Sequence, residues 1–503
     1  MKNVILKIPN ITSYFFILLF CYAAISKIMD FENFQVQIAQ SPLLSTYAGL
    51  ISYSTIIIEL IIVIALSFLR TRLLGLYASL FLMAAFTIYI YLILNYSDFI
   101  PCSCGGILQN MNWTQHLTFN IICTILLIVA IILLERKRST RTSRLISNIS
   151  LLLILSSGTV VYLFLTSEHM IKKENNFTRR FIPTAVMKSK ALPLSADSYY
   201  LAGIENEKIY LGDPKSPLIL TTVDTTLIRA SARKLTLDNT HYQFRNVQLQ
   251  VQKPYYYLYD GTVPVIYRGR IKDSIAKTIS YNEVYFNQFI PLDSTQFAFR
   301  TIATKNKQFI LAGLKLEKSR RAVVNLYANI LKKQKDGIFD SDGKLLYDRK
   351  KSNLIYIHSY RNQIIVMNND FKVQHQLHTI DTTTIARVKI RKLTNGSYKM
   401  VAPPLKVNKS STVYGGILFN QSNLIGKHES PQTWKRASII DIYRTDKQEY
   451  LGSFYIYNRN DVSISNMMVN GSSLYLIIGN ELIKYKLNKK ITDSYSTGKA
   501  ENL

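Results

Sequence analysis

Cysteine is scarce in this chain, and its scarcity excludes several kinds of metal site. Only four cysteines occur in 503 residues, and none follows Met170. Cys102 and Cys104 have only His116 near them, so they cannot complete the four ligands of a structural zinc site. A copper(I) site would need a Met and His cluster that this segment lacks. We therefore expect no metal centre.

Acidic residues are also few, with 32 Asp and Glu against 61 Lys and Arg. The imbalance is concentrated after residue 170, where 51 basic residues accompany 26 acidic ones. Such an excess of positive charge indicates an anionic neighbour, and nucleic acid is the usual one. No nucleic-acid motif is present, so we expect no nucleic acid as partner. Anionic lipid headgroups or an acidic protein surface are the expected neighbours instead.

Charge is nearly absent from five apolar runs: Ile11–Ile28, Leu50–Phe68, Leu73–Leu94, Leu117–Leu134 and Leu145–Thr166. Each run is close to the roughly 20 residues that a helix needs to cross about 30 Å of hydrocarbon. A signal peptide is the competing interpretation of the first run, but no small-residue cleavage site follows it. The pattern predicts five transmembrane helices.

The basic residues between these runs predict the orientation of the chain in the membrane. If the helices alternate in direction, only Lys27 falls on one side and nine basic residues fall on the other: Lys2, Lys7, Arg70, Arg72, Arg136, Lys137, Arg138, Arg141 and Arg144. This bias predicts a bacterial inner-membrane protein with a cytoplasmic N-terminus and a periplasmic C-terminal domain. Arg179 and Arg180, just past the fifth run, weigh against it, although long domains translocate largely regardless of charge.

Helical periodicity is missing from residues 171–503, where short alternating runs of Tyr, Ile, Val, Thr and Leu are separated by polar turns. One phrase recurs loosely: a strand, a polar turn and a second strand, as in Asn470–Tyr485. At roughly 40–50 residues per blade, the segment makes a β-propeller of six or seven blades. Two packed β-sandwiches are the alternative. We thus predict a helical bundle over residues 1–140, a fifth transmembrane helix over 141–170 and an all-β domain over 171–503.

Cys102 and Cys104 lie in the segment PCSCGG between the third and fourth runs, on the predicted periplasmic side. Exposed thiols oxidise in that compartment, so we interpret them as a redox-active pair. A disulfide between positions i and i+2 closes a small, strained ring, and strained disulfides exchange readily. A fourth helix that starts near Asn112 or Thr114 would also favour a nearby thiolate through its positive dipole end.

Five further residues are accessory candidates. Cys21 and Cys123 are either inert core residues or a second pair that passes electrons onward, which requires the first and fourth helices to be neighbours. Glu59 lies inside the second run, so it must face the bundle interior, pair with a cation or be protonated. Lys27 can snorkel to the interface, and His116 could assist proton transfer beside the cysteine loop.

Several segments of the first four runs carry a family resemblance: Ser26-Lys-Ile-Met-Asp-Phe-Glu-Asn-Phe, Ser41-Pro-Leu-Leu, Glu59, Cys102-Ser-Cys-Gly-Gly and Trp113-Thr-Gln-His-Leu-Thr-Phe-Asn. Over about Ile11–Glu135 the chain resembles the MauE/DoxX family of redox-associated membrane proteins, in the branch common in Bacteroidota. The resemblance implies a four-helix bundle that supports disulfide formation or thiol electron transfer in exported proteins. It also implies that Cys102 and Cys104 are the redox pair, with Lys27 and Glu59 as family positions without an assigned role.

The expected function is therefore thiol–disulfide exchange in the cell envelope, which would make the protein an oxidoreductase with a quinone as candidate cofactor. The expected partner is a periplasmic thioredoxin-like or cysteine-containing client, which the propeller would bind. The competing hypothesis is a non-catalytic one, in which the helices only anchor a propeller that acts as an envelope sensor or scaffold. The client, the electron acceptor and the direction of electron flow do not follow from the sequence.

Overall fold

The computed structural model describes residues 7–40, 48–96, 111–137, 141–168, 175–205, 207–317, 322–393, 398–402 and 404–495. The chain forms two compact units. The first, which we call the helical unit, consists of Met1–Lys173 and Val388–Pro404. The second, which we call the propeller unit, consists of Glu174–Arg387 and Leu405–Leu503.

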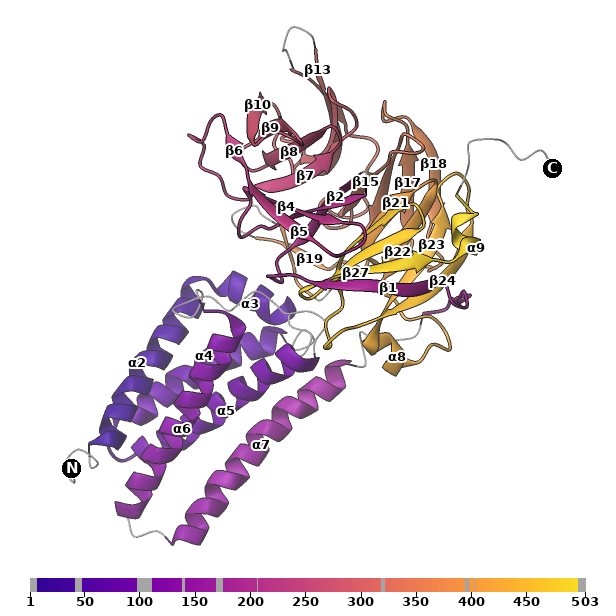
Figure 1. The fold of residues 1–503 in the computed structure, drawn as a ribbon. Helices are drawn as coiled ribbons and strands as arrows, with labels where there is room; N and C mark the ends of the chain where they lie inside the picture. Colours follow the sequence, from indigo (N-terminus) through magenta and orange to yellow (C-terminus); the bar gives the residue numbers. More distant parts are fainter. Residues whose placement is uncertain are drawn as a thin grey trace. The chain divides into compact units, whose positions relative to one another are not determined.

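The helical unit contains α2 (Ile8–Met29), α3 (Phe31–Gln40), α4 (Ala48–Ser67), α5 (Arg72–Tyr96), α6 (Trp113–Lys137) and α7 (Thr142–Glu168), labelled in Figure 1. All but α3 are long and apolar enough to cross a membrane. The prediction of five membrane-length helices is confirmed, and it indicates a multi-pass membrane protein. The short helix α3 was not predicted, because its ten residues alternate between apolar and polar types and fall outside the apolar runs.

The long helices pack as neighbours that alternate in direction. Helix α2 contacts α4 and α6, and α5 contacts α4, α6 and α7. At one end of the bundle, Arg72 Nη1 at the start of α5 donates to Asn10 Oδ1 at the start of α2, at 2.7 Å. Near the same end, Tyr77 of α5 donates to Glu135 Oε1 at the end of α6, at 3.3 Å. The alternation that the orientation argument assumed is therefore present, while the side of the membrane on which each end lies stays a prediction.

The propeller unit has six blades, each built on consecutive strands that pair in sequence order; β1 joins the sixth blade and β6 the second out of that order. Blade 1 holds β2 (Tyr200–Glu205), β3 (Lys208–Gly212), β4 (Ile219–Asp224) and β5 (Ala230–Lys234). Blade 2 holds β7 (Gln248–Gln252), β8 (Tyr255–Asp260), β9 (Val265–Arg270) and β10 (Ile275–Tyr281), with β6 (Thr236–Leu237) parallel to β10 at its edge. Blade 3 holds β11 (Gln288–Pro291), β12 (Gln296–Ile302), β13 (Phe309–Leu316) and β14 (Ala322–Tyr327).

Blade 4 holds β15 (Gly343–Asp348), β16 (Asn353–His358), β17 (Gln363–Met367) and β18 (Val373–His378). Blade 5 holds β21 (Asn408–Tyr414), β22 (Ile417–Ser422), β23 (Ala437–Arg444) and β24 (Tyr450–Tyr457). Blade 6 holds β25 (Ile464–Asn470), β26 (Ser473–Ile478), β27 (Glu481–Leu487) and, as its outer strand, β1 (Val186–Pro193). A two-stranded hairpin of β19 (Ile390–Lys392) and β20 (Tyr398–Met400) lies between blades 4 and 5 in sequence. The propeller prediction is confirmed with six blades, and the β-sandwich alternative is wrong.

Strand β1 closes the ring of blades. It precedes blade 1 in sequence yet pairs antiparallel with β27, from Val186 opposite Leu487 to Pro193 opposite Glu481. In Figure 1 the magenta β1 lies beside the yellow β27. The inner strand β25 of blade 6 also contacts β2 of blade 1. The first and last parts of the propeller are thus joined by a shared sheet, and the last blade gains its fourth strand.

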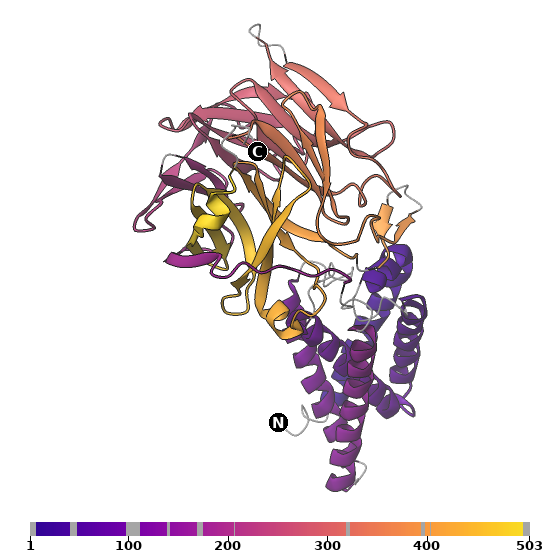
Figure 2. The ribbon, with the colours of Figure 1, turned by 90° about the vertical axis from the view of Figure 1, so that its right-hand side faces the viewer.

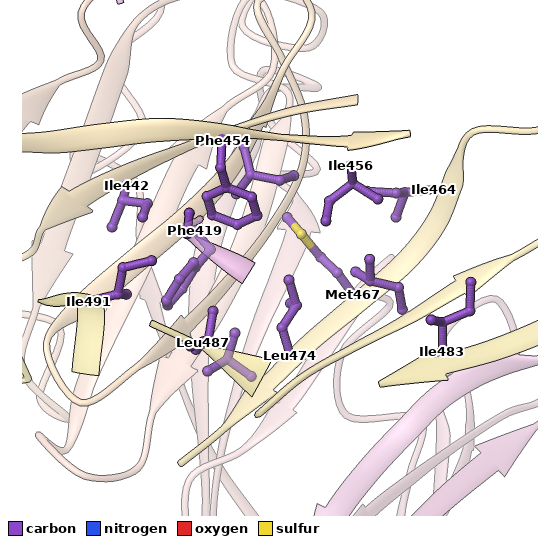
Figure 3. Close-up of a cluster of buried hydrophobic side chains, with 14 of the residues drawn as sticks. Phe419, Ile442, Phe454, Ile456, Ile464, Met467, Leu474, Ile483, Leu487 and Ile491 are labelled. Atoms are coloured by element: carbon purple, nitrogen blue, oxygen red, sulfur yellow. The ribbon is translucent and has the colours of Figure 1, made fainter. Parts of the chain in front are cut away.

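Blade-to-blade packing explains why the central strands are apolar on both faces. In β26, Leu474 and Leu476 pack against blade 5, whereas Tyr475 and Ile477 pack against blade 1. Figure 3 shows the first of these interfaces, where Phe454 of blade 5 meets Met467 of blade 6. Because alternate side chains of a strand point to opposite faces, each blade contributes to two cores. Two short helices, α8 (Pro431–Arg436) and α9 (Lys489–Thr492), also occur where only strands were predicted.

A buried arginine fixes the segment that precedes β1. The side chain of Arg179 is fully buried, with Nη1 donating to Glu429 Oε1 at 2.7 Å and Nε donating to Asp441 Oδ1 at 2.8 Å. Burial alone would lower the pKa of Arg179, but the two carboxylates outweigh it and raise that pKa above its ordinary value. The positive charge of Arg179 therefore stabilises the propeller. This explains why a basic residue occurs on the predicted periplasmic side, just past the fifth apolar run.

We predict that Arg179→Met destabilises blade 5, because two buried carboxylates lose their cation, at a cost of about 3–5 kcal/mol. Hydrogen exchange of the peptide that covers β23, in the full-length protein, should become faster. Arg270→Met, at an exposed arginine of β9, is the matched control and should leave exchange unchanged. Equal exchange in the two variants would show that Arg179 does not hold the blade.

Candidate functional site

The predicted redox pair lies outside the described residues. Cys102 and Cys104 fall within residues 97–110, for which the structure describes no placement. The site is therefore built from the residues that follow this loop on α6 and from the helices that pack against α6.

Helix α6 begins with a reciprocal capping arrangement. Asn112 Oδ1 accepts a hydrogen bond from the backbone N–H of Gln115 at 2.8 Å, and Gln115 Oε1 accepts one from the N–H of Asn112 at 3.0 Å. This capping box satisfies two donors that the first helical turn leaves without partners. The expectation that the fourth transmembrane helix starts near Asn112 or Thr114 is confirmed, since α6 begins at Trp113, and its positive end follows Cys104 in the chain.

A polar line runs along one face of α6. His116, Asn120 and Cys123 are spaced by four and three residues, so they share a face of the helix. Asn120 and Cys123 are buried, and His116 is half-buried beside the ring of Trp113, at a centroid distance of 6.1 Å. Asn120 Nδ2 and His116 Nδ1 are both shielded and have no hydrogen-bond partner among the described residues. Two polar atoms on this face are thus free to bind water or a ligand.

Lys27 and Glu59 form an ion pair between α2 and α4. Lys27 Nζ donates to Glu59 Oε1, and the two side chains are 14% and 1% exposed. The second carboxylate oxygen, Glu59 Oε2, is buried without a partner among the described residues. The suggestion that Lys27 snorkels to the interface is wrong, because the carboxylate of Glu59 draws its ammonium group into the bundle. Three alternatives were predicted for Glu59: that it faces the bundle interior, pairs with a cation or is protonated. The structure shows the first two.

The two cysteines inside the helices occupy neighbouring elements. Helices α2 and α6 contact each other, which is the condition that a second cysteine pair required. Cys21 is half-buried and Cys123 is buried, and both are free thiols in this structure. Cys123 packs in the bundle core with Phe16, Phe20 and Leu127. The two alternatives, a pair that passes electrons onward and two inert core residues, both remain predictions.

The propeller unit has a cavity of about 580 Å³ along its axis. Its lining comes from the inner strands of all six blades and includes Glu205, Gln250, Gln252, Tyr347, Asp348, Arg349, Lys350, Tyr414 and Asn470. Arg349 forms an ion pair with Glu205. The carboxylate of Asp348 already accepts N–H bonds from Gly415 and Gly416, at 3.2 and 2.6 Å. The cavity therefore presents amides, hydroxyls and the Lys350 ammonium to a ligand.

The comparison with known families concerns the helical unit. Residues 5–134 match the family model of the methylamine utilisation protein MauE. We call this segment the MauE region; it covers α2 to α6 almost completely and confirms the MauE resemblance. No curated protein matches the chain.

Several solved structures are similar to the propeller unit. A member of the DUF4221 family from Bacteroides vulgatus is 14% identical with a TM-score of 0.40, and the match covers 63% of this chain and 99% of that one. A putative exported protein from Bacteroides fragilis is 8% identical with a TM-score of 0.38, over 63% and 99% of the two chains. A streptogramin B lyase is 12% identical with a TM-score of 0.35, over 59% and 97%. All three TM-scores are below 0.5, so no function is inferred from them.

Within the MauE region, the structure brings together some of the predicted site residues and leaves others apart. Lys27 and Glu59 meet directly, and His116 shares the inner face of α6 with Cys123. Asn120, which completes that face, was missed because a lone Asn in an apolar run gives little signal. No group of three or more His, Cys, Asp or Glu able to hold a metal ion occurs in the part of the chain that the structure describes.

Lys344 of β15 is a second residue that sequence reasoning missed. Its Nζ donates to the carbonyl oxygen of Ser411 at 3.0 Å, and no carboxylate pairs with it in the described part of the chain. Burial lowers the pKa of Lys344 from 10.5 to about 8. A lysine in a strand of alternating polar and apolar residues is usually taken to face solvent. The sequence therefore did not indicate that Lys344 is shielded from it.

We predict that single changes to the ion pair destabilise the helical unit, whereas a double change does not. Lys27→Met or Glu59→Leu alone leaves one buried charge unpaired, at a cost of about 3–5 kcal/mol. Replacing both residues by apolar ones should restore most of the stability, as thermal unfolding in detergent would measure. Lys7→Met, at an exposed lysine, is the control. A double variant as unstable as the single ones would contradict direct pairing.

We also predict that Lys344→Met stabilises the propeller in a pH-dependent way. Below pH 8 the folded protein carries a buried ammonium group, whereas above about pH 10.5 Lys344 is neutral in both states. The gain from the substitution should therefore be about 3 kcal/mol at pH 7 and vanish above pH 10.5. Denaturant unfolding across this range, with exposed Lys350→Met as control, measures it. A gain that stays constant with pH would argue against a depressed pKa.

Proposed function

We propose that this protein exchanges disulfide bonds with an exported client through Cys102 and Cys104, with the MauE region as its membrane-embedded redox module. The observation that carries the proposal is the Lys27–Glu59 ion pair inside the bundle. Charged side chains are costly within hydrocarbon, and those that occur there commonly serve proton or charge movement. A bundle that only anchored a propeller would not need the carboxylate oxygen that this pair leaves without a partner among the described residues, Glu59 Oε2.

The exchange transfers two electrons and two protons from the client to this protein and needs no third reactant. A client thiolate attacks one sulfur of the Cys102–Cys104 disulfide and forms a mixed disulfide, and the second client thiol then displaces the bound cysteine. The client gains a disulfide bond. Cys102 and Cys104 become two thiols, which together hold two electrons and two protons more than their disulfide did. The start of α6 follows the pair in the chain, and its positive dipole end would favour the thiolate form of the leaving sulfur.

The described residues suit a quinone as the cofactor that restores the disulfide. Bound in the bundle, a quinone would supply the two-electron oxidation that returns Cys102 and Cys104 to a disulfide. Asn120 Nδ2, which is buried without a partner, can donate to a carbonyl oxygen, and His116 Nδ1 can do so in one tautomer. Glu59 Oε2 has a free lone pair inside the bundle, so this carboxylate can accept a proton while Lys27 keeps it in place.

The axial cavity of the propeller supports a role in binding. Its amide and hydroxyl groups, together with Lys350, line a space of about 580 Å³, which suits a short peptide segment or a small molecule. We propose that this cavity captures the client and so brings its thiols to the cysteine loop. The arrangement requires both the loop and the propeller to face the periplasm, as the distribution of basic residues predicts.

The test uses single cysteine variants as traps. With Cys104→Ser or Cys102→Ser, the remaining thiolate can still attack the disulfide of an oxidised client and release one client thiol, but no second cysteine is present to resolve the product. We therefore expect a mixed disulfide with the client on a non-reducing gel after acid quenching and alkylation. The double variant should form none and should leave client thiols reduced. Ser103→Ala, between the two cysteines, is the matched control. Full client oxidation in the double variant would instead support the anchor hypothesis, in which the propeller acts as a sensor or scaffold.

A further inference from the structure

The hairpin of β19 and β20 belongs to the helical unit, although its sequence lies between blades 4 and 5. Val388–Pro404 clusters with the helices, whereas Arg387 before it and Leu405 after it belong to the propeller unit. Figure 2 shows the short orange hairpin beside the indigo α3. Helix α3 and strand β20 are in contact. A segment joined at both ends to the propeller thus forms part of the membrane-spanning unit.

The length of this connection sets it apart from the others. Blade 4 ends at His378 and blade 5 begins at Asn408, about 30 residues later, which exceeds every other connection between consecutive blades. Connections of this length in a compact domain are uncommon and usually have a role of their own. The propeller ring itself does not need the extra residues, since other blades are joined by far shorter segments.

Two contacts fasten the hairpin to α3. Arg391 Nη1 donates to Gln35 Oε1 at 2.6 Å. Val401 packs against a buried cluster that includes Phe34 and Ile38 of α3. The same cluster contains residues of α2 and α4, namely Ala24, Ala48 and Ile56. The hairpin is therefore held both by a hydrogen bond and by apolar packing at the point where three helices meet.

One further contact links α3 to the ion pair. The ring of Phe34, which is 5% exposed, lies with its centroid 5.6 Å from Lys27 Nζ. An ammonium group over an aromatic face is attracted by it, and the attraction strengthens when water is excluded. Lys27 in turn holds Glu59. The cluster on which Val401 packs thus includes Phe34, whose ring lies beside Lys27, and Lys27 pairs with Glu59.

We infer that the hairpin is a positioning element of the redox site, which holds Phe34 over Lys27 and keeps the ion pair shielded. Because both its ends continue into the propeller, a client bound by the propeller can alter the hold of the hairpin on α3 and so open or close access to Glu59. This inference deepens the proposed function and rests on it, since it regards the ion pair as a working part of the site. Val401 and Arg391 act through Phe34 and do not touch the reacting atoms.

The experiment measures access to Glu59 directly, in the full-length protein in lipid nanodiscs. A hydrophobic carbodiimide labels membrane-embedded carboxyl groups, and mass spectrometry of the α4 peptide reports the rate at Glu59. We expect Val401→Asp and Arg391→Ala each to raise this rate several-fold. Lys392→Ala, at an exposed residue of the same strand, should leave it unchanged. Labelling requires no client and no thiol exchange, so a failure of the proposed function would not affect it.

A second experiment uses a cross-linked variant, because the hairpin can remain bound to α3 after a single substitution. In Gln35→Cys/Arg391→Cys, a reducible bis-maleimide linker joins the hairpin to α3 and reduction of its internal disulfide releases it, because the two native side chains meet at their ends. We expect slow labelling of Glu59 in the cross-linked form and fast labelling in the released form. The unmodified protein under the same two conditions corrects for effects of its own cysteines. Equal rates in the locked and released forms would overturn the inference.

Discussion

The contact on which the helical unit depends is the ion pair between Lys27 and Glu59, because neither charge is tolerable alone in an apolar bundle. Desolvation of two charges is recovered only if they meet directly, so α2 and α4 must keep a fixed register. Phe34 covers the remaining face of the ammonium group, which places α3 across the same point. The pair thus orders three helices at once, yet it leaves Glu59 Oε2 without a partner. A structural pair would be expected to satisfy both oxygens, and the free oxygen is the atom to which our proposal assigns a chemical use.

Both units must pair their backbone N–H and C=O groups, but they do so in different surroundings. In hydrocarbon, an unpaired N–H or C=O group costs several kcal/mol, so the long helices satisfy their backbone internally. The propeller reaches the same end in an aqueous setting by ring closure, in which β1 supplies the outer strand of blade 6. Arg179 then holds the chain just before β1 against blade 5. Closure therefore rests on backbone pairing in one strand and on one buried guanidinium group beside it.

The features that follow from length and periodicity could be predicted, and those that depend on tertiary neighbours could not. Bilayer thickness sets the length of a spanning helix, and alternation such as that of Leu474 and Tyr475 marks a strand packed on both faces. The pairing of Lys27 with Glu59 depends on which helices are adjacent, so Lys27 resembled an interface residue. Arg179 resembled a topology signal for the same reason. The cysteine loop lies outside the described residues, and that half of the site therefore remains a prediction.

Joining capture and chemistry in one chain has a kinetic consequence. Few residues separate Glu168, the last of α7, from Phe181, which already bridges Ser453 in the propeller. On the proposed function, a client held by the propeller would meet the cysteine loop as an intramolecular partner, and short connections give effective concentrations of about millimolar. Thiol exchange between dilute proteins is limited by encounter, so tethering raises its rate without any change in thiol chemistry. The hairpin adds a second connection between the same two parts, and on the proposed function this connection would make capture and the state of the ion pair interdependent.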